Sequence, residues 1–390
     1  MISSLIVLGS TGSIGTTTLN CVRTNKNIKV VLLSANKNIK KLYNQSLLHK
    51  VKNVIIEDEK KYIKYKNIFK KKNINLHLGF KNINKILKKK ATYSINSISG
   101  IEGLEPTLKI IPFSKKILIA NKETIICAWE IIKNKLNKHN CEFIPIDSEH
   151  FSIWNLIRNY NDKKIDKIIL TASGGPFLKK KKSELLNIKP KVALNHPNWK
   201  MGKKISIDSS TMMNKIFEFI EAKKIFNLSK RKISIIIHPH SYVHAIVFLK
   251  SNIMKLLAHE TNMSVPIKNA LEIYEKSSDK KIFKQIDNLN FLKFEKPNVK
   301  QFPLLSIINL IPNHESYFET ILITINDNLV KKYLNNKINY ISIHQNLLRL
   351  IKSPIFIKYY KLKPKNFYDI KRMVNITNIY IENKIKHYER

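Results

Sequence analysis

A short glycine-containing turn between a strand and a helix constrains the fold more than any other feature of the sequence. Residues Leu5–Leu8 are apolar and predict a buried strand, the next seven residues read GSTGSIG, and a helical pattern begins at about Ile14. In such a turn the first glycine permits a tight bend, the second lets backbone N–H groups approach a pyrophosphate, and the third allows close packing of strand and helix. The spacing alone is a weak signal, and a plain turn is the alternative. We expect the turn to bind a dinucleotide through Gly9, Ser10, Thr11, Gly12, Ser13, Ile14 and Gly15.

The pattern that follows the turn favours the cofactor interpretation. Further apolar runs predict strands at Val30–Leu33, Val54–Ile56, Tyr93–Ile98, Ile117–Ala120 and Phe143–Ile146, with helical patterns such as Glu123–Leu136 between them. Regular alternation of strands and helices is typical of a parallel sheet covered by helices on both faces. We therefore expect an α/β chain that begins with a Rossmann-like domain over residues 1–146.

The end of the second predicted strand indicates which dinucleotide is bound. NAD-binding domains carry an acidic residue there, about twenty residues after the glycines, to bind the ribose hydroxyls. This chain has Asn36, Lys37 and Asn38 instead. A lysine at this position suits the 2′-phosphate of NADPH, although one more lysine in a lysine-rich chain is the alternative.

The rest of the chain predicts two further domains. Residues 147–273 combine strands at Ile168–Thr171, Ile233–Ile237 and Val243–Leu249 with one long helix over Asp208–Ile225, which indicates an α+β catalytic domain. Residues 274–302 are rich in Lys, Asn and Asp and suit a linker. Residues 303–390 predict a small C-terminal helical domain, with helices at 304–311, 321–334 and 343–351.

Two acids that follow the last strand of the first domain indicate a metal site. Asp147 and Glu149 are two residues apart and would point to the same side of an extended backbone. Two carboxylates that converge repel each other unless a cation neutralises them, and oxygen ligands suit Mg²⁺ or Mn²⁺. A solvated strand end is the alternative for this pair taken alone.

The predicted long helix adds a third acid. Asn214 and Glu218 are four residues apart and Lys215 and Glu218 three apart, so one helix face offers an amide, a cation and a carboxylate. Ser209 is expected near the start of this helix, where backbone N–H groups favour a phosphate. An exposed face with a Lys–Glu pair is the alternative.

Three further segments carry candidate ligand contacts. Ser173 stands before two glycines after a predicted strand, which is typical of an anion-binding turn, or of an ordinary one. Residues 195–202 carry His196, Trp199 and Met201 and end at Gly202, which suits a lid with a glycine hinge; a packed loop is the alternative. A strand-to-helix junction holds Asn121, Lys122 and Glu123, where Lys122 can donate to a developing oxyanion and Glu123 can cap the helix.

Composition excludes some classes of protein and leaves one question open. Three cysteines without a CxxC pair argue against a disulfide framework or a zinc site, and no run of eighteen apolar residues is present to span a membrane. With no signal segment before the first strand, we expect a cytoplasmic protein. The net charge of +42 indicates either an anion-binding surface or a compositional bias towards Lys, Ile and Asn. Because the basic residues are dispersed, we expect no nucleic-acid partner.

Together these motifs resemble the 1-deoxy-D-xylulose 5-phosphate reductoisomerase family. The resemblance rests, in order, on GSTGSIG, the ANKN segment that ends at Asn38, Ile119–Glu123, IDSEH up to His150, SGGPF from Ser173, HPNWKMGKKISIDSSTMMNK from His196 and Ile237–Pro239. The C-terminal third is similar only in its helical pattern. Departures include Asn36 and Ile216, where the family usually has glycine, and His240, where it commonly has glutamine.

The resemblance implies an enzyme that uses NADPH and a divalent metal (Mn²⁺, Mg²⁺ or Co²⁺) to convert a sugar phosphate. It implies that Asp147, Glu149 and Glu218 hold the metal and that Ser148 and Lys122 contact the reacting oxygens. Ser173, Ser209, Asn214 and Lys215 would bind the phosphate, His196, Trp199 and Met201 would belong to the lid, and Asn121, Lys122, Glu123 and Gly202 would join the cofactor site. The product would be 2-C-methyl-D-erythritol 4-phosphate, an isoprenoid precursor, and the enzyme a homodimer.

Two rival functions remain open at this point. One is another NADP-linked sugar-phosphate dehydrogenase that needs no metal, which the three-carboxylate set argues against. The other is a decayed, non-enzymatic binder of anions or nucleic acid, which acids at all three metal positions argue against. Loss of activity on chelation would argue against the first, and salt-sensitive DNA binding without turnover would support the second.

Overall fold

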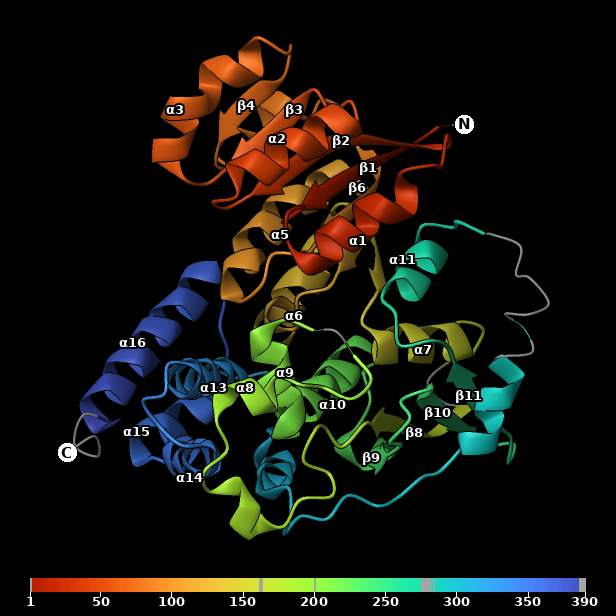
Figure 1. Cartoon of the computed structure of the whole chain (residues 1–390), viewed down its shortest axis with the longest axis vertical. Helices are drawn as coiled ribbons and strands as arrows, with labels where there is room; N and C mark the ends of the chain where they lie inside the picture. The colour runs from red at the N-terminus through yellow and green to blue at the C-terminus, as the bar shows by residue number, and fades with distance from the viewer. Residues whose placement is uncertain (1, 161–163, 200, 275–281, 283–284, 386–390) are drawn as a thin grey trace. The chain divides into compact units, whose positions relative to one another are not determined.

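The chain forms two compact units, which are described separately. The computed structural model describes residues 2–160, 164–199, 201–274, 282 and 285–385. The first unit comprises Met1–Ile125, Glu130–Phe151 and Met263–Lys276, and the second comprises Ile126–Trp129, Ser152–Asn262 and Ser277–Arg390. Figure 1 labels most of the helices and strands of both units. Within the described ranges, no helix has the length and apolar character needed to cross a membrane.

A seven-stranded parallel sheet forms the centre of the first unit. Its spatial order is β4-β3-β2-β1-β5-β6-β7, so the strand before the glycine turn lies in the middle. Leu5–Leu8 of this strand are fully buried, as expected for a strand covered on both faces. The predicted strands and the α/β fold class are confirmed, whereas β4 was not predicted. The strands are β1 (Ser3–Leu8), β2 (Ile28–Ala35), β3 (Asn53–Ile56), β4 (Asn75–Leu78), β5 (Ala91–Asn96), β6 (Ser114–Ile119) and β7 (Glu142–Pro145).

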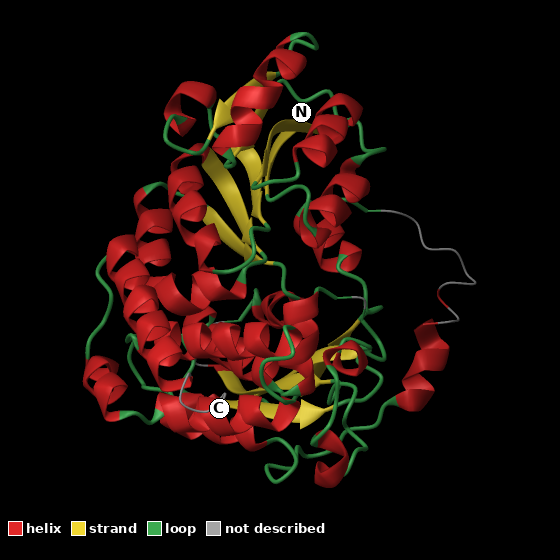
Figure 2. Cartoon of the chain, turned by 60° about the vertical axis from the view of Figure 1, so that its left-hand side comes forward, coloured by secondary structure: helices red, strands yellow, loops and turns green. Residues whose placement is uncertain are grey.

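Helices cover both sides of this sheet, as Figure 2 shows. Those between successive strands of the sheet return the chain to the start of the next strand, which is the arrangement that parallel pairing requires. Another helix, α11, comes from a distant part of the chain and packs against α1. The helices are α1 (Ser13–Val22), α2 (Ile39–Leu48), α3 (Glu59–Lys70), α4 (Ile83–Ile86), α5 (Leu104–Ile110), α6 (Lys122–Lys138, which continues into the second unit), α7 (Ser148–Ile157, likewise) and α11 (Ser264–Ala270).

The second unit contains a four-stranded mixed sheet. Its order is β11-β10-β8-β9, with β8 and β9 parallel and β10 antiparallel to both of its neighbours. The three predicted strands are confirmed as β8 (Ile165–Ala172), β9 (Ile233–Ile237) and β10 (Val243–Leu249). The edge strand β11 (Met254–Ala258) was not predicted, and none of its residues is fully buried.

Helices make up the remainder of the second unit. The predicted helical C-terminal region is confirmed: α13 packs against both α14 and α16. Residues 303–310 form 3₁₀ turns and not the predicted α-helix. In the predicted linker, Glu295 forms a bridge with Ile237, and residues 275–281 and 283–284 lie outside the described ranges. The helices are α8 (Pro190–Ala193), α9 (Lys203–Ser210), α10 (Met213–Ile225), α13 (Phe318–Leu334), α14 (Tyr340–Ile351), α15 (Pro354–Ile357) and α16 (Phe367–Ile385).

The predicted single helix over residues 208–225 is wrong, because the chain breaks at Met212. This residue has a φ of +63°, which separates α9 from α10. The hydroxyls before the break bond to the local backbone: Ser210 Oγ donates to the Ile207 carbonyl over 2.7 Å, and Thr211 Oγ1 donates to the same carbonyl over 3.2 Å. Side-chain bonds of this kind compete with helix propagation. Ser209 therefore lies in the last turn of α9 and not at a helix start.

Four helices end at an asparagine in the left-handed conformation. Asn73, Asn140, Asn227 and Asn336 follow α3, α6, α10 and α13, with φ between 45° and 57°. At each of them the next N–H bonds back five residues, as from Ile74 to the Phe69 carbonyl over 3.1 Å. This is the Schellman arrangement, in which glycine usually takes the left-handed position. Asparagine is the residue that tolerates this conformation best after glycine.

Candidate active site

Two glycines of the GSTGSIG turn are fixed by close contacts of the backbone. Gly9 has a φ of +73°, and a Cβ on it would lie 2.9 Å from the Ser97 carbonyl carbon. A Cβ on Gly15 would lie 2.5 Å from both the Gly9 carbonyl oxygen and Ser10 Cα. The turn therefore brings the N-terminus of α1 directly onto the end of β1. Backbone N–H groups at such a helix start are suited to a phosphate.

The side chains around the turn divide into buried and open groups. Ser10 is fully buried, and its hydroxyl donates to Gln45 Oε1 over 2.8 Å, so it holds the turn against α2. Gly12 and Ser13 are exposed, and Thr11 and Ile14 are half-buried. Lys41, which was not predicted, donates to the Thr11 carbonyl over 3.0 Å. The sequence motif did not reveal this contact, because Lys41 lies three residues after the segment Asn36–Asn38 that follows β2.

The residues after β2 are open to solvent. Asn36, Lys37 and Asn38 are all exposed. Asn38 caps α2, since its Oδ1 accepts a hydrogen bond from the Lys41 backbone N–H over 3.2 Å. No acidic side chain occupies these three positions. The segment thus leaves the Lys37 ammonium available to an anion at the carboxyl edge of the sheet.

The parallel pairing of β6 and β7 brings Lys122 and Asp147 together. Each residue lies just beyond its strand, at the carboxyl edge where ligands bind in open α/β sheets. The Lys122 ammonium forms an ion pair with Asp147 Oδ2, and His150 Nδ1 lies 3.0 Å from Asp147 Oδ1. Burial alone would raise the pKa of Asp147, but the Lys122 charge and the His150 hydrogen bond outweigh it and hold the pKa well below its usual value. Asp147 is therefore an ionised carboxylate.

The two neighbouring residues begin a helix. Ser148 and Glu149 form the first turn of α7, and the Ser148 hydroxyl donates to Glu149 Oε2. The expectation that Asp147 and Glu149 share one side of an extended backbone is therefore wrong in its geometry. A helix start still favours carboxylates, because its free N–H groups carry partial positive charge. Glu149 is half-buried, whereas Ser148 is buried.

At the neighbouring junction, between β6 and α6, Asn121 fixes the start of the helix. Its Oδ1 accepts from the Thr124 backbone N–H over 2.9 Å, and its Nδ2 donates to the Gly100 carbonyl over 2.5 Å. Asn121 is buried, and Glu123 is half-buried in the first turn of the helix. The cap therefore belongs to Asn121, and Glu123 is not needed for it.

One face of α10 in the second unit joins an amide, a cation and a carboxylate. Glu218 accepts from Asn214 Nδ2 over 2.6 Å and forms an ion pair with Lys215. Glu218 and Lys215 are 1% and 4% exposed. A buried charge pair of this kind is strongly destabilised when one partner is removed. The spacing argument for this face is correct, although the helix starts later than predicted.

Ser173 lies in a turn that presents hydrogen-bond donors. It is followed by Gly174 and Gly175, with φ of +80° and +67°. Its hydroxyl oxygen accepts from the Gly175 N–H over 3.1 Å and contacts His196 Nε2 over 2.9 Å. Because His196 Nδ1 accepts from the backbone N–H groups of Asn198 and Trp199, Nε2 carries the proton and donates to Ser173. The Ser173 hydrogen can then be donated to an anion.

The loop from Asn195 to Gly202 is anchored to the second sheet. Asn198 Nδ2 donates to the Pro239 carbonyl over 2.5 Å and to Ser241 Oγ over 3.0 Å. Burial lowers the pKa of His196 to about 4, which keeps its ring neutral. Trp199 and Met201 are half-buried, and Lys200 lies outside the described residues. Gly202 has an ordinary φ of −67° with space for a Cβ, so its conformation does not require glycine.

Comparison with known proteins places this arrangement in one family. Residues 5–129 match the family described as 1-deoxy-D-xylulose 5-phosphate reductoisomerase, and residues 143–226 and 259–378 match two C-terminal domains of that enzyme. A relative of that name from Pelagibacter ubique (strain HTCC1062) is 46% identical over 98% of each chain. Another, from Thermoanaerobacter sp. (strain X514), is 38% identical over 87% of this chain and 89% of its own.

Solved structures agree over the full chain. A DOX-P reductoisomerase in complex with NADPH, fosmidomycin and magnesium superposes with a TM-score of 0.89 at 28% identity, covering 100% of both chains. The 1-deoxy-D-xylulose 5-phosphate reductoisomerase of Zymomonas mobilis in complex with NADPH gives a TM-score of 0.87 at 27% identity, covering 97% of this chain and 98% of that one.

Proposed function

The chain belongs to the 1-deoxy-D-xylulose 5-phosphate reductoisomerase family, and we propose that it catalyses the reaction of that family. This reaction is the NADPH-dependent rearrangement and reduction of 1-deoxy-D-xylulose 5-phosphate to 2-C-methyl-D-erythritol 4-phosphate in isoprenoid precursor biosynthesis. The observation that carries the proposal is the ion pair of Lys122 with Asp147 at the carboxyl edge of a dinucleotide-binding sheet. It supplies an ionised carboxylate and a fixed ammonium where a substrate beside NADPH would lie.

The acids suit a divalent cation. We propose that Asp147, Glu149 and Glu218 hold Mg²⁺, Mn²⁺ or Co²⁺, because carboxylate oxygens are hard ligands and Asp147 is held ionised. Solved relatives contain magnesium. When bound, the cation supplies Lewis acidity to the substrate oxygens and NADPH supplies the hydride. Lys122 orients Asp147 and can donate to a substrate oxygen, and Ser148 stands beside it at the start of α7.

The phosphate end of the substrate would be held by the second unit. We assign it to Ser173, Ser209, Asn214 and Lys215. Ser173 has a hydrogen to donate, and Lys215 supplies a buried positive charge. In a water-poor site, donors aimed at an anion are worth more than in water. The lid residues that would close over the substrate are His196, Trp199 and Met201.

The cofactor would lie along the carboxyl edge of the first sheet. We assign its pyrophosphate to the turn from Gly9 to Gly15 and its 2′-phosphate to the segment Asn36–Asn38, with Lys41 adding positive charge beside the turn. Asn121, Lys122, Glu123 and Gly202 complete this set. The N-terminus of α1 provides the N–H groups that a pyrophosphate requires.

Consumption of NADPH tests the proposal. The assay follows NADPH absorbance with 1-deoxy-D-xylulose 5-phosphate, with and without Mn²⁺, and then repeats it with Asp147→Asn. We expect metal-dependent turnover that falls at least roughly 100-fold in the variant. Asp166→Asn is the matched control, because Asp166 is exposed on β8. A folded protein that leaves NADPH unchanged in the presence of Mn²⁺ would overturn the substrate assignment.

We also propose that the enzyme works as a cytoplasmic homodimer. Cys21, Cys127 and Cys141 are buried and none of them is part of a disulfide, which suits a reducing compartment. The edge strand β11 exposes Met254 and Leu256, at 54% and 38%, and an exposed apolar edge is a common site of pairing between chains. A molar mass of 45.5 kDa by light scattering, which is the mass of one chain, would exclude the dimer.

A further inference from the structure

The segments that carry Ser173 and Ser209 pack backbone against backbone. A Cβ on Gly175 would lie 2.9 Å from both the Ser209 carbonyl oxygen and Ser210 Cα. The two segments come from different elements, the turn after β8 and the last turn of α9. Their spacing decides whether the two serines can bind one phosphate together.

A single side chain, that of Tyr340 at the start of α14, contacts both segments. Its hydroxyl donates to the Ser210 carbonyl over 2.8 Å. Its ring meets Phe177 edge-to-face, with centroids 5.0 Å apart. Tyr340 is 1% exposed, and burial raises the pKa of its hydroxyl, which therefore remains a donor.

The hydrogen bond from Tyr340 satisfies a backbone carbonyl, that of Ser210, which has no partner within its own helix. Ser210 is the last residue of α9, where carbonyls lack partners within the helix. The break at Met212 prevents α10 from continuing the pattern. Tyr340 is in turn fixed by the cap of α14, where Asn339 Oδ1 accepts from the Ser342 N–H over 2.8 Å. The contact therefore joins a rigid helix start to a helix end.

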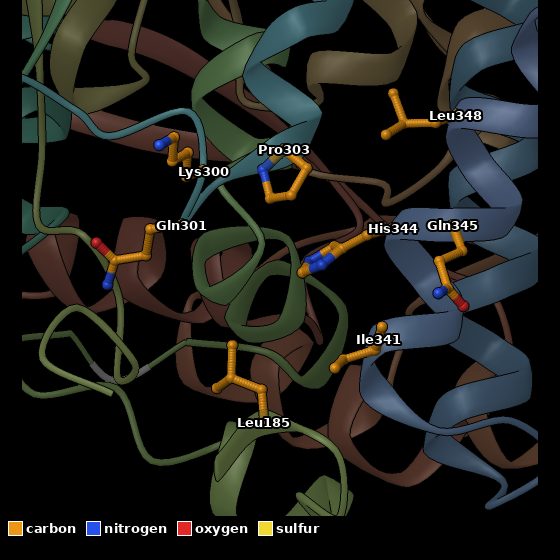
Figure 3. A pocket seen from close by; sticks show the side chains of 8 residues that line it. All are labelled: Leu185, Lys300, Gln301, Pro303, Ile341, His344, Gln345 and Leu348. Carbon is orange, nitrogen blue, oxygen red and sulfur yellow. The ribbon is translucent and has the colours of Figure 1, made fainter. Parts of the chain in front are cut away.

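A cavity lies beside the next turn of α14 after Tyr340. His344, one turn along α14, has its ring 5.1 Å from that of Tyr340. Figure 3 shows His344 among the side chains that line a cavity of about 200 Å³, with Leu185, Gln301 and Pro303. Gln301 Nε2 also donates to the Phe177 carbonyl over 3.2 Å. The Phe177 segment is thus held by Tyr340 and by Gln301, which also lines this cavity.

We propose that Tyr340 is a positioning residue for phosphate binding, which sets the spacing of the Ser173 and Ser209 segments. The inference rests on the proposed function only in assigning these two serines to the phosphate. Tyr340 itself touches neither the substrate nor the cofactor in this scheme. Its loss should weaken binding of the phosphate and leave the chemical step unchanged, because uniform binding affects KM and not kcat.

The test compares Tyr340→Phe with Tyr333→Phe. Tyr333 is a matched control: it is also 1% exposed, its ring packs edge-to-face on that of Tyr340 with centroids 5.8 Å apart, and its hydroxyl donates to a different carbonyl, that of Ile188, over 2.9 Å. Because Tyr333→Phe keeps this ring contact, the two variants differ only in which carbonyl loses its hydroxyl donor. For Tyr340→Phe we expect a rise of about three- to tenfold in the KM for the sugar phosphate and in the Kd for inorganic phosphate measured by calorimetry. The kcat and the KM for NADPH should stay within about twofold of wild type, and Tyr333→Phe should change none of these values.

Two results would overturn the inference: an unchanged phosphate Kd in Tyr340→Phe, or an equal rise in Tyr333→Phe. Wild-type protein that binds no phosphate would overturn it as well. Because the phosphate Kd is measured without turnover, it separates the inference from the proposed function. A wild-type enzyme that leaves the sugar phosphate unreacted, with the difference in phosphate Kd intact, would refute the proposed function alone.

Discussion

Replacing Gly15 with alanine should damage the cofactor site by steric conflict alone. The added Cβ would lie 2.5 Å from Gly9 O and Ser10 Cα, against the 3.4 Å of an ordinary contact, so about 0.9 Å of movement is needed. Both opposing atoms belong to the backbone, and no flexible side chain can give way. Overpacking of this kind costs about 1–3 kcal/mol, which corresponds to roughly 5- to 150-fold in affinity if the cofactor-binding conformation bears it.

Gly202→Ala provides the matched control for unfolding alone, because it adds the same methyl group where no atom lies within 4 Å; since Gly202 is assigned to the cofactor site, the NADPH affinity of Gly15→Ala is compared only with that of wild type. The assay is NADPH binding by fluorescence, together with urea unfolding of both variants. We expect Gly15→Ala to lose NADPH affinity and to unfold at lower urea, and Gly202→Ala to stay within about 0.5 kcal/mol of wild type. Equal NADPH affinity in Gly15→Ala and wild type would refute the steric reasoning. An equal loss of stability to urea in Gly15→Ala and Gly202→Ala would refute it as well.

Three further outcomes follow from the site. Ser173→Ala should raise the KM for the sugar phosphate about 10- to 100-fold, since a hydrogen bond to a charged group is lost, and steady-state kinetics will show it. Glu218→Gln leaves Lys215 buried without its carboxylate; we expect metal-dependent turnover to vanish and the second unit to lose about 3–5 kcal/mol of stability, measured by urea titration. His196 has a pKa lowered to about 4, so the folded state resists protonation and loses stability as pH falls from about 6.5 towards 4; an NMR titration midpoint near 6.5 would contradict this.

The sequence was sufficient where local pattern and tertiary structure agree. Leu5–Gly15 predicted both the central strand and the turn, because a fully buried strand must be apolar throughout and the turn leaves no space for a side chain at Gly9 or Gly15. The spacing of Asn214, Lys215 and Glu218 likewise predicted their contacts, since helix geometry fixes them.

The remaining features depend on partners that lie far away in the chain. The strands β4 and β11 are short and partly exposed, so their apolar pattern is incomplete. The break at Met212 places a non-glycine residue at a positive φ, which local propensity argues against. Lys41 and Tyr340 contact their sites only because the chain folds back. Lys41 bonds to the Thr11 carbonyl beside the start of α1, and Tyr340 bonds to the Ser210 carbonyl, 130 residues earlier in the chain.

The asparagine helix ends show where a low glycine content can be tolerated. At Asn73, Asn140, Asn227 and Asn336 the backbone needs a residue that can adopt a left-handed conformation, and asparagine does so at modest cost. At Gly9 the same sign of φ coincides with backbone atoms 2.9 Å from the Cβ position, and no side chain fits. Drift towards a glycine-poor composition can therefore proceed at the helix ends and must stop at the cofactor turn. Of the remaining glycines, Gly9 and Gly15 are fixed by backbone atoms that leave no room for a side chain, whereas Gly202 has room for one.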